Sequence, residues 1–240
     1  MWGGYYGYKL YKPVAEKKAE AQKKLAKLRQ KNPDIAPIVI EGRKIAVTWW
    51  GAAWNKNLES YADYANRIGR GRSYVMSGMV LDLRIGPGVI NAKVSGSRKT
   101  PYDVLIRIDK LSEARWKIIV KQCSRRIAGI SDLVEGKFPE DLAQIFLKRG
   151  TGLFPSPSEI HLDCSCPDWA EMCKHVAAAL YGVGARLDHD PTLFFTLRGI
   201  DFSELLKKSV EEKIGAMLKN AGKKSGRTLD DADIAGLFGL

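Results

Sequence analysis

Four potential metal ligands fall within twelve consecutive positions of this 240-residue chain. Cys164, Cys166, Cys173 and His175 follow the pattern C-x-C-x6-C-x-H, which uses three of the four cysteines in the sequence. Three thiols and one imidazole suit a closed tetrahedral zinc site. Because residues i and i+2 of a strand point to the same side, Cys164 and Cys166 can share one ion. The pattern therefore predicts zinc as a structural cofactor, with no ligand position left open for catalysis.

Two other interpretations of these cysteines remain open. A disulfide between neighbouring cysteines is one, although such a bond would contribute little in a reducing compartment. A redox-active thiol pair is the other, although thiol-exchange sites favour C-x-x-C at a helix start. The sequence shows no apolar secretory segment at Met1, and no apolar stretch approaches the roughly 18 residues that span a bilayer. We therefore expect a cytoplasmic protein with no membrane partner.

The ligand pattern resembles the SWIM zinc finger, in which C-x-C…C-x-H ligands lie on two short strands and a helix. Cys164-Ser165-Cys166-Pro167 and Cys173-Lys174-His175 match that motif at every ligand. Three further segments resemble those of prokaryotic SWIM proteins: Trp49-Trp50-Gly51-Ala52-Ala53-Trp54, Gly96-Ser97-Arg98 with Pro101-Tyr102, and Leu197-Arg198-Gly199. The resemblance implies an accessory protein in DNA transactions that acts with a helicase-type translocase or a recombination factor.

Positive charge is concentrated in the first two-fifths of the chain. The sequence has a net charge of +12, and residues 1–99 account for all of it, with 19 Lys or Arg against 7 Asp or Glu. By contrast, residues 151–203 carry three basic and seven acidic side chains. Basic surfaces bind phosphate backbones through counterion release. We therefore expect the amino-terminal half to contact nucleic acid, and the finger to brace the fold or dock another protein. The charge does not distinguish DNA from RNA, and DNA is what the resemblance implies.

Residues 74–109 predict an antiparallel meander of three strands, because apolar and polar side chains alternate along them. The alternation covers 79–85, 90–95 and 102–108. One face of this sheet should be apolar, and the other should carry several basic side chains. The candidate nucleic-acid contacts are Arg84, Lys93 and Arg107 on the polar face and Arg98 and Lys99 in the loop before the third strand. An ordinary polar outer face is the alternative.

Helices are expected on both sides of the meander. The lysine-rich stretch 15–31 predicts a helix that buries little, either a mobile basic arm or a solvated charged helix. A short strand over 44–48 should lead into a helix with apolar residues at helical spacing from Trp50 to Ile68. Gly69-Arg70-Gly71-Arg72 should then form a turn, on which Arg70 and Arg72 suit phosphate contact or simply face solvent.

The carboxy-terminal half also has helical patterns. The apolar spacing from Trp116 to Ile127 predicts a helix in which Cys123 is buried and is not a metal ligand. Pro139 suits the first turn of another helix, which should end near Lys148. Further helices are expected at 176–187 and 201–219, and a strand at 159–163 should lead to the cysteines.

Together these elements predict an α+β fold: an antiparallel three-stranded meander with flanking helices, followed by a small ββα zinc-binding module packed with carboxy-terminal helices. The expected regions are a basic arm (1–32), an α+β domain (33–150), the SWIM-type region with following helices (151–220), and a linker and tail (221–240). The sequence has no phosphate-binding loop, dinucleotide motif or catalytic triad, so we expect no enzyme activity. Two functions remain open: a nucleic-acid-binding accessory protein, or a protein-interaction subunit whose finger docks a larger complex.

Overall fold

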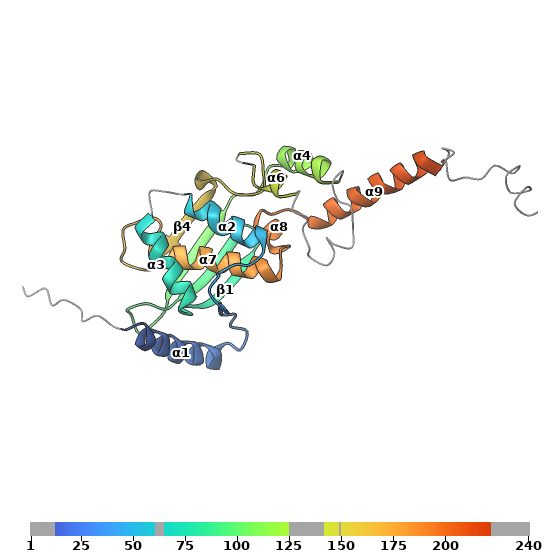
Figure 1. Cartoon of the computed structure of the whole chain (residues 1–240). Helices are drawn as coiled ribbons and strands as arrows, with labels where there is room; N and C mark the ends of the chain where they lie inside the picture. The colour runs from blue at the N-terminus through green and yellow to red at the C-terminus, as the bar shows by residue number, and fades with distance from the viewer. Residues whose placement is uncertain (1–12, 61–64, 125–141, 149, 222–240) are drawn as a thin grey trace, which may run out of the picture.

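A four-stranded antiparallel sheet with the order β1-β2-β3-β4 forms the centre of the α+β fold (Figure 1). The computed structural model describes residues 13–60, 65–124, 142–148 and 150–221. The strands are β1 (Val80–Gly86), β2 (Val89–Val94), β3 (Tyr102–Ile108) and β4 (Ile160–Cys164). The first three confirm the predicted meander. Strand β4, which ends at the first zinc ligand, pairs with β3 and places Cys164 opposite Val104.

The zinc-binding segment contributes one strand to this sheet, not the two that were expected. After Cys164 the chain bends and loops through Pro167, which has no N–H to donate to a neighbouring strand. One hydrophobic cluster contains residues from both sides of residue 150, such as Val104 and Val176. The zinc-binding region therefore shares its core with the region before it.

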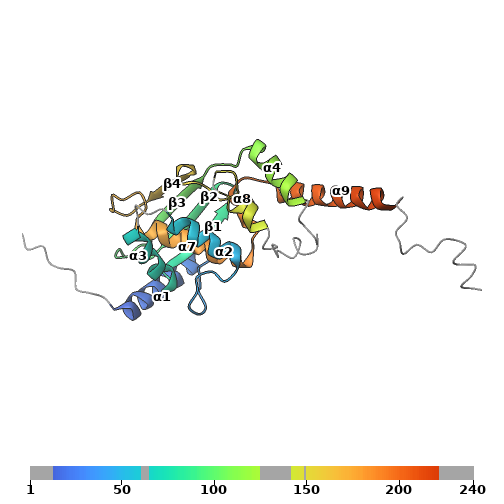
Figure 2. The same ribbon diagram turned by 45° about the horizontal axis from the view of Figure 1, so that its top comes forward.

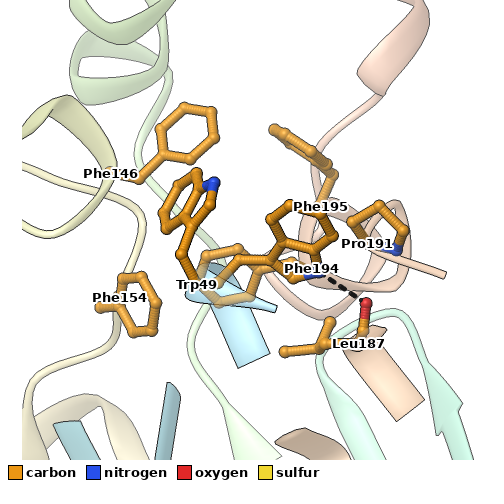
Figure 3. A pocket seen from close by; sticks show the side chains of 8 residues that line it. Trp49, Phe146, Phe154, Leu187, Pro191, Phe194 and Phe195 are labelled. Carbon is orange, nitrogen blue, oxygen red and sulfur yellow. Dashed lines mark hydrogen bonds between the residues drawn. The ribbon is translucent and has the colours of Figure 1, made fainter. Parts of the chain in front are cut away.

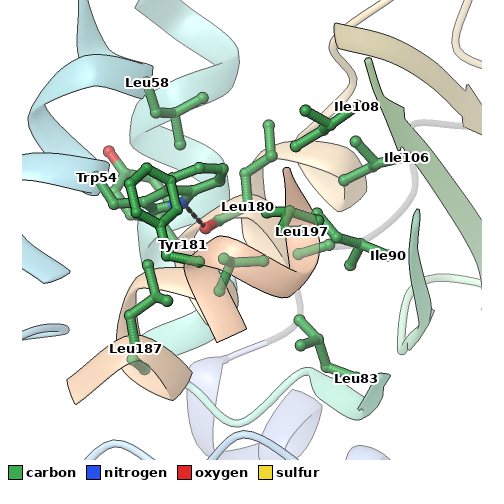
Figure 4. Packing of buried hydrophobic residues seen from close by; sticks show 14 of the residues in the cluster. Trp54, Leu58, Leu83, Ile90, Ile106, Ile108, Leu180, Tyr181, Leu187 and Leu197 are labelled. Carbon is green, nitrogen blue, oxygen red and sulfur yellow. Dashed lines mark hydrogen bonds between the residues drawn. The ribbon is translucent and has the colours of Figure 1, made fainter. Parts of the chain in front are cut away.

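Helix α7 (Lys174–His189) confirms the helix predicted after the cysteines and lies at the centre of the packing. It crosses one face of the sheet, and α2 (Trp49–Glu59) and α3 (Ala65–Met76) cover its other side (Figures 1 and 2). Small residues allow this close approach, because a Cβ on Gly184 would meet the Asn55 side chain at 2.3 Å. Figure 4 shows Trp54 of α2, whose Nε1 donates to the carbonyl of Leu180 at 2.8 Å.

The remaining helices lie outside this central packing. They are α1 (Val14–Lys31), α4 (Glu113–Ser124), α6 (Ala143–Phe146), the 3-10 helix η3 (Pro157–Glu159), α8 (Leu193–Leu197) and α9 (Phe202–Ala221). The predicted helices at 15–31 and 201–219 are confirmed, and Cys123 is buried in α4 as expected. Helix α9 extends away from the sheet (Figures 1 and 2). Among the described residues, no helix has both the length and the apolar character needed to cross a bilayer.

Helix α1 is anchored to the rest of the fold through the middle of its length. Its Ala21 is buried, and Lys24 Nζ donates to the carbonyls of Gly96 at 2.9 Å and Arg98 at 2.7 Å. These contacts favour the second interpretation, a charged helix on the surface of the fold, over a mobile arm. The first residues of the expected arm, the residues expected to be helical at Ile127 and Pro139, and the expected tail lie outside the described residues.

The strand predicted over 44–48 does not form. The backbone N–H groups of Val47 and Thr48 donate to the carboxylate of Asp188 at the end of α7, so a side chain takes the place of a sheet partner. Thr48 Oγ1 then accepts a hydrogen bond from Gly51 N at 3.2 Å and caps α2. The sequence pattern did not indicate this role of Asp188.

The turn predicted at Gly69-Arg70-Gly71-Arg72 is also wrong, because these residues lie within α3. Gly71 faces α7, where an added Cβ would lie 2.4 Å from the Cβ of Ala177. The glycine therefore serves the close packing of two helices and does not end one. Arg70 and Arg72 are exposed on the helix.

Candidate metal centre

The four predicted ligands come together where the end of β4 meets the start of α7. The ligand atoms of Cys164, Cys166, Cys173 and His175 all lie within 4.8 Å of one another. His175 Nδ1 lies 3.9 Å from Cys164 Sγ and 3.8 Å from Cys173 Sγ. A tetrahedron with Zn–S of about 2.3 Å and Zn–N of about 2.0 Å has edges of roughly 3.5–3.8 Å. The donor set and its spacing therefore fit a zinc ion held by four protein ligands.

Secondary structure positions three of the four ligands. Cys164 is the last residue of β4, while Cys173 is the N-cap of α7 and His175 lies in its first turn. Cys173 and His175 are each only 1% exposed, so the helix side of the site is part of the core. Cys166 lies in the intervening loop and is half-buried. Metal binding therefore joins the sheet to the central helix.

Aromatic packing orients the His175 imidazole. The Tyr102 ring stacks on it with centroids 4.3 Å apart, and the Tyr74 ring meets it edge-on at 5.7 Å. Gly96 provides the space, since a Cβ there would lie 2.4 Å from the Tyr102 ring and 2.9 Å from His175 Nε2. Nδ1 is thus directed toward the three sulfurs and Nε2 toward Gly96.

The thiols interact with one another as well as with the histidine. A hydrogen bond from the Cys164 thiol lowers the pKa of Cys173 to about 3 and outweighs the opposite effect of burial. The same hydrogen bond raises the pKa of Cys164. Zinc displaces such thiol protons, because coordinated cysteines are deprotonated. Metal affinity is consequently expected to fall as the pH is lowered.

The three segments noted outside the cysteine motif all contact the metal-binding elements. Trp50 Nε1 donates to the carbonyl of Leu187 in α7 at 2.8 Å. Gly96 lies against His175, as described above. Arg198 is fully buried, and its Nη2 donates at 2.8 Å to Glu159 Oε1, immediately before β4. These segments therefore brace the strand and the helix that carry the ligands, a role that the sequence alone did not reveal.

The outer face of the sheet is balanced in charge among the described residues. Arg84 pairs with Asp82 at 3.4 Å, and Lys93 pairs with Asp103 at 2.6 Å. Asp163 of β4 lines the same hollow of this face as Lys93, and Arg107 is exposed opposite His161. Three acidic side chains thus accompany the three basic ones. The assignment of Arg84, Lys93 and Arg107 to nucleic-acid binding stays a prediction, on a face whose basic charge is largely offset.

Cations from three separate elements instead approach the metal centre. Arg98 lies 4.9 Å from the Tyr102 ring centroid and donates to the carbonyl of Ser165 at 3.1 Å. Lys174 Nζ lies 5.9 Å from the Tyr74 ring centroid, and Arg67 of α3 pairs with Asp168 at 3.0 Å. Sequence reasoning missed Arg67 and Lys174, because only the fold brings these side chains to the finger.

Of the three other candidate residues, Lys99 and Arg70 lie near the metal centre. Lys99 is exposed beside Arg98 in the loop between β2 and β3. Arg72 lies 3.8 Å from Glu59, and Arg70 is exposed on the same helix, close enough to influence the pKa of Tyr74. Lys99 and Arg70 therefore lie on the metal-centre side of the fold, whereas the partner of Arg72 is Glu59 at the end of α2. His161 pairs with Asp109 at 2.9 Å and is not part of the metal cluster.

An aromatic pocket lies near the end of α7, whereas His175 lies at the start of that helix. Figure 3 shows the side chains that line the pocket. It is lined by Trp49, Trp50, Phe146, Phe154, Leu187, Pro191, Phe194 and Phe195. The space between these side chains is about 10 Å³, which is close to the minimum for one water molecule. Its lining includes no titratable or nucleophilic side chain, so the pocket serves packing and gives no support to catalysis.

Comparison with known proteins agrees with the geometry. Residues 151–183 match the family model of the SWIM zinc finger. The chain is also 37% identical over 163 residues to the "Uncharacterized protein Rv2102" of Mycobacterium tuberculosis (strain ATCC 25618 / H37Rv). That match covers 68% of the chain and 58% of the relative, so the chain spans less than two thirds of that protein's length. No solved structure matches the chain.

Proposed function

The chain contains a SWIM zinc finger, and from this premise we propose that it is a nucleic-acid-binding protein whose basic surface adjoins the zinc centre. The observation that carries the proposal is the position of the loop 96–99. On one side, Lys24 of α1 donates to the carbonyls of Gly96 and Arg98. On the other side, Arg98 donates to the carbonyl of Ser165, between two zinc ligands. The loop therefore connects the basic helix to the metal site.

Helix α1 supplies the largest concentration of basic residues in this region. Its sequence contains seven Lys or Arg and two Glu. The exposed cations on it are Lys18, Lys23, Lys27, Arg29 and Lys31. With Lys99 nearby, they form what we term the α1–loop surface. Closely spaced cations of this kind bind phosphate backbones through counterion release.

Charge balance favours the α1–loop surface over the outer face of the sheet. Arg84 and Lys93 are each paired with an aspartate, and such pairs attract phosphates less than unmatched cations do. A zinc centre next to α1 also gives the metal a clear role, because it fixes Tyr102 and, through stacking, Arg98. We propose DNA as the target, with the finger as the part that holds the surface in shape.

The test is a salt titration of binding to labelled DNA by fluorescence anisotropy. Lys23→Gln, Lys27→Gln and Lys99→Gln together should weaken binding and reduce the slope of log K against log salt by about 2–3, since each duplex phosphate contact contributes about 0.9. Arg84→Gln, Lys93→Gln and Arg107→Gln together are the matched control with the same change in charge. This control should have a smaller effect.

Two outcomes would contradict the proposal. If the sheet-face variant lost more affinity than the α1–loop variant, the binding surface would lie on the sheet. If the wild-type protein bound neither single-stranded nor duplex nucleic acid at low salt, the proposal of nucleic-acid binding itself would fail. Melting temperatures and zinc contents equal to those of the wild type would show that both triple variants fold.

A further inference from the structure

Trp169 is 91% exposed, more than any other large apolar side chain among the described residues. It lies in the six-residue loop between the zinc ligands Cys166 and Cys173. Tryptophan is highly buried on average, because its large ring gains from leaving water. An indole directed into solvent from the loop between two metal ligands is therefore a candidate for contact with a ligand.

The loop holds Trp169 in this position from both sides. Asp168 Oδ1 accepts a hydrogen bond from Arg67 Nη2 at 3.0 Å and another from Ala170 N at 3.4 Å. Three residues after Trp169, Met172 is 2% exposed and begins the buried part of the chain that leads into α7. The backbone around the indole is thus fixed by an ion pair and by the core. Because the loop already holds Trp169 in place, less conformational entropy of the protein is lost when a ligand binds.

The surroundings of this loop favour a phosphate-bearing ligand. Arg67 reaches Asp168 from α3, Lys174 follows the loop at the start of α7, and Arg98 reaches Ser165 from the loop between β2 and β3. The charge of Asp168 is matched by Arg67. Arg67 is therefore occupied by Asp168, and the cations that remain to attract a phosphate beside this loop are Lys174 and Arg98.

We propose that Trp169 is a stacking platform for an unpaired base of single-stranded nucleic acid, an inference that rests on the proposed function and deepens it. Bases inside a duplex are covered on both faces by their neighbours, so away from the duplex ends an exposed indole can stack only on an unpaired base. Aromatic platforms beside a basic groove are the means by which proteins bind single strands without sequence preference. The α1–loop surface would contact the phosphates, and Trp169 would add the selectivity for unpaired bases.

The experiment compares the binding of labelled oligothymidine with that of its duplex with oligoadenosine, by fluorescence anisotropy at fixed salt. Trp169→Ala should weaken single-strand binding roughly 5- to 100-fold, as expected for one stacked base. Trp169→Phe is the conservative control and should retain most of the affinity, because it keeps an aromatic face. Duplex binding should change little in either variant. Because the indole is exposed, both variants should keep the melting temperature and zinc content of the wild type.

A second measurement tests the contact directly. Oligothymidine should quench the tryptophan fluorescence of the wild type, and this quenching should be smaller in Trp169→Phe. If Trp169→Ala bound the single strand as the wild type does, the inference would be wrong, the proposed function would stand, and a protein partner would be the better candidate for this indole. Absence of wild-type binding to either form of DNA would overturn both proposals.

Discussion

The guanidinium of Arg198 donates to Glu159 Oε1 at 2.8 Å, although the arginine side chain is completely buried. A second arginine, Arg115, reaches the same oxygen at 3.1 Å. Arg198 Nη1 also donates to the carbonyl of Asp109 at 2.8 Å. One carboxylate thus compensates two cations directly before the strand that carries the first zinc ligand. The position of β4, and with it the metal site, depends on this cluster.

Removal of that carboxylate should destabilise the protein strongly. Glu159→Ala leaves the buried Arg198 without its ionic partner, which costs about 3–5 kcal/mol in comparable sites. Urea unfolding followed by circular dichroism measures the change. Asp163→Ala, at an exposed position on β4, is the control and should change the free energy of unfolding by no more than about 0.5 kcal/mol. Equal effects of the two substitutions would contradict the role assigned to Glu159.

The same carboxylate should make the free energy of unfolding depend on pH in the acidic range. Partial burial would raise the pKa of Glu159, but hydrogen bonds from Arg198 and Ser156 outweigh it and lower the pKa from 4.5 to about 2. The unfolded chain therefore binds the proton more readily, so this contribution is complete above about pH 4.5 and is lost as the pH falls toward 2.

The acid effect can be separated from zinc release by comparing the wild type with Glu159→Gln. Both proteins lose zinc as their ligands become protonated, but only the wild type also protonates Glu159. The difference in their free energies of unfolding should shrink between about pH 4.5 and 2. A difference that stays constant over this range would rule out a lowered pKa at Glu159.

The fourth cysteine offers a matched control for the metal site. Cys173→Ser should bind less than one equivalent of zinc and should lose several kcal/mol of stability, because structural zinc contributes directly to folding. Cys123→Ala changes an equally buried cysteine in α4 and should cost only about 1 kcal/mol while it retains the zinc. Metal analysis and thermal unfolding with and without chelator would check both. Full zinc content in Cys173→Ser would refute the ligand assignment.

Replacing glycine by alanine should have opposite effects on stability at two positions in α3. Gly69 has open space where its Cβ would be, so Gly69→Ala should stabilise the helix by up to about 1 kcal/mol. A Cβ on Gly71 would meet the backbone carbonyl carbon of Ala177 at 2.9 Å, so Gly71→Ala should separate α3 from α7 and lower the melting temperature. If both substitutions were destabilising, the helical assignment of this segment would be in doubt.

The features that the sequence predicted well depend on short spacings. Cys164 and Cys166 are two residues apart, and so are Cys173 and His175, and few arrangements satisfy both pairs except one metal site. The meander was predictable because its apolar alternation has a period of two and because its turns are local. Cys123 was assigned to the core from helical spacing alone, and it is buried.

The errors concern residues whose meaning depends on distant partners. Gly71 predicted a turn because glycine is common in turns. In the structure it packs against Ala177 of α7, more than one hundred positions away in the sequence. The sequence pattern at Val47 and Thr48 predicted a strand, but their backbone N–H groups donate to the Asp188 carboxylate and not to a neighbouring strand. The balance of charge on the outer sheet face depends on the register that places Lys93 opposite Asp103. None of these contacts follows from local pattern, because each is set by how the helices and strands assemble.

The burial of α7 on both sides has a practical consequence for attempts to isolate the metal-binding segment. A fragment limited to residues 151–183 would lack the strands β1 to β3 and the helices α2 and α3 that cover the central helix. Such an excised piece would place Ala177, Leu180 and Val183 in water, and ion binding would have to compensate for that exposure. This finger is therefore not transplantable as an autonomous unit, and its affinity for zinc is a property of the entire folded body.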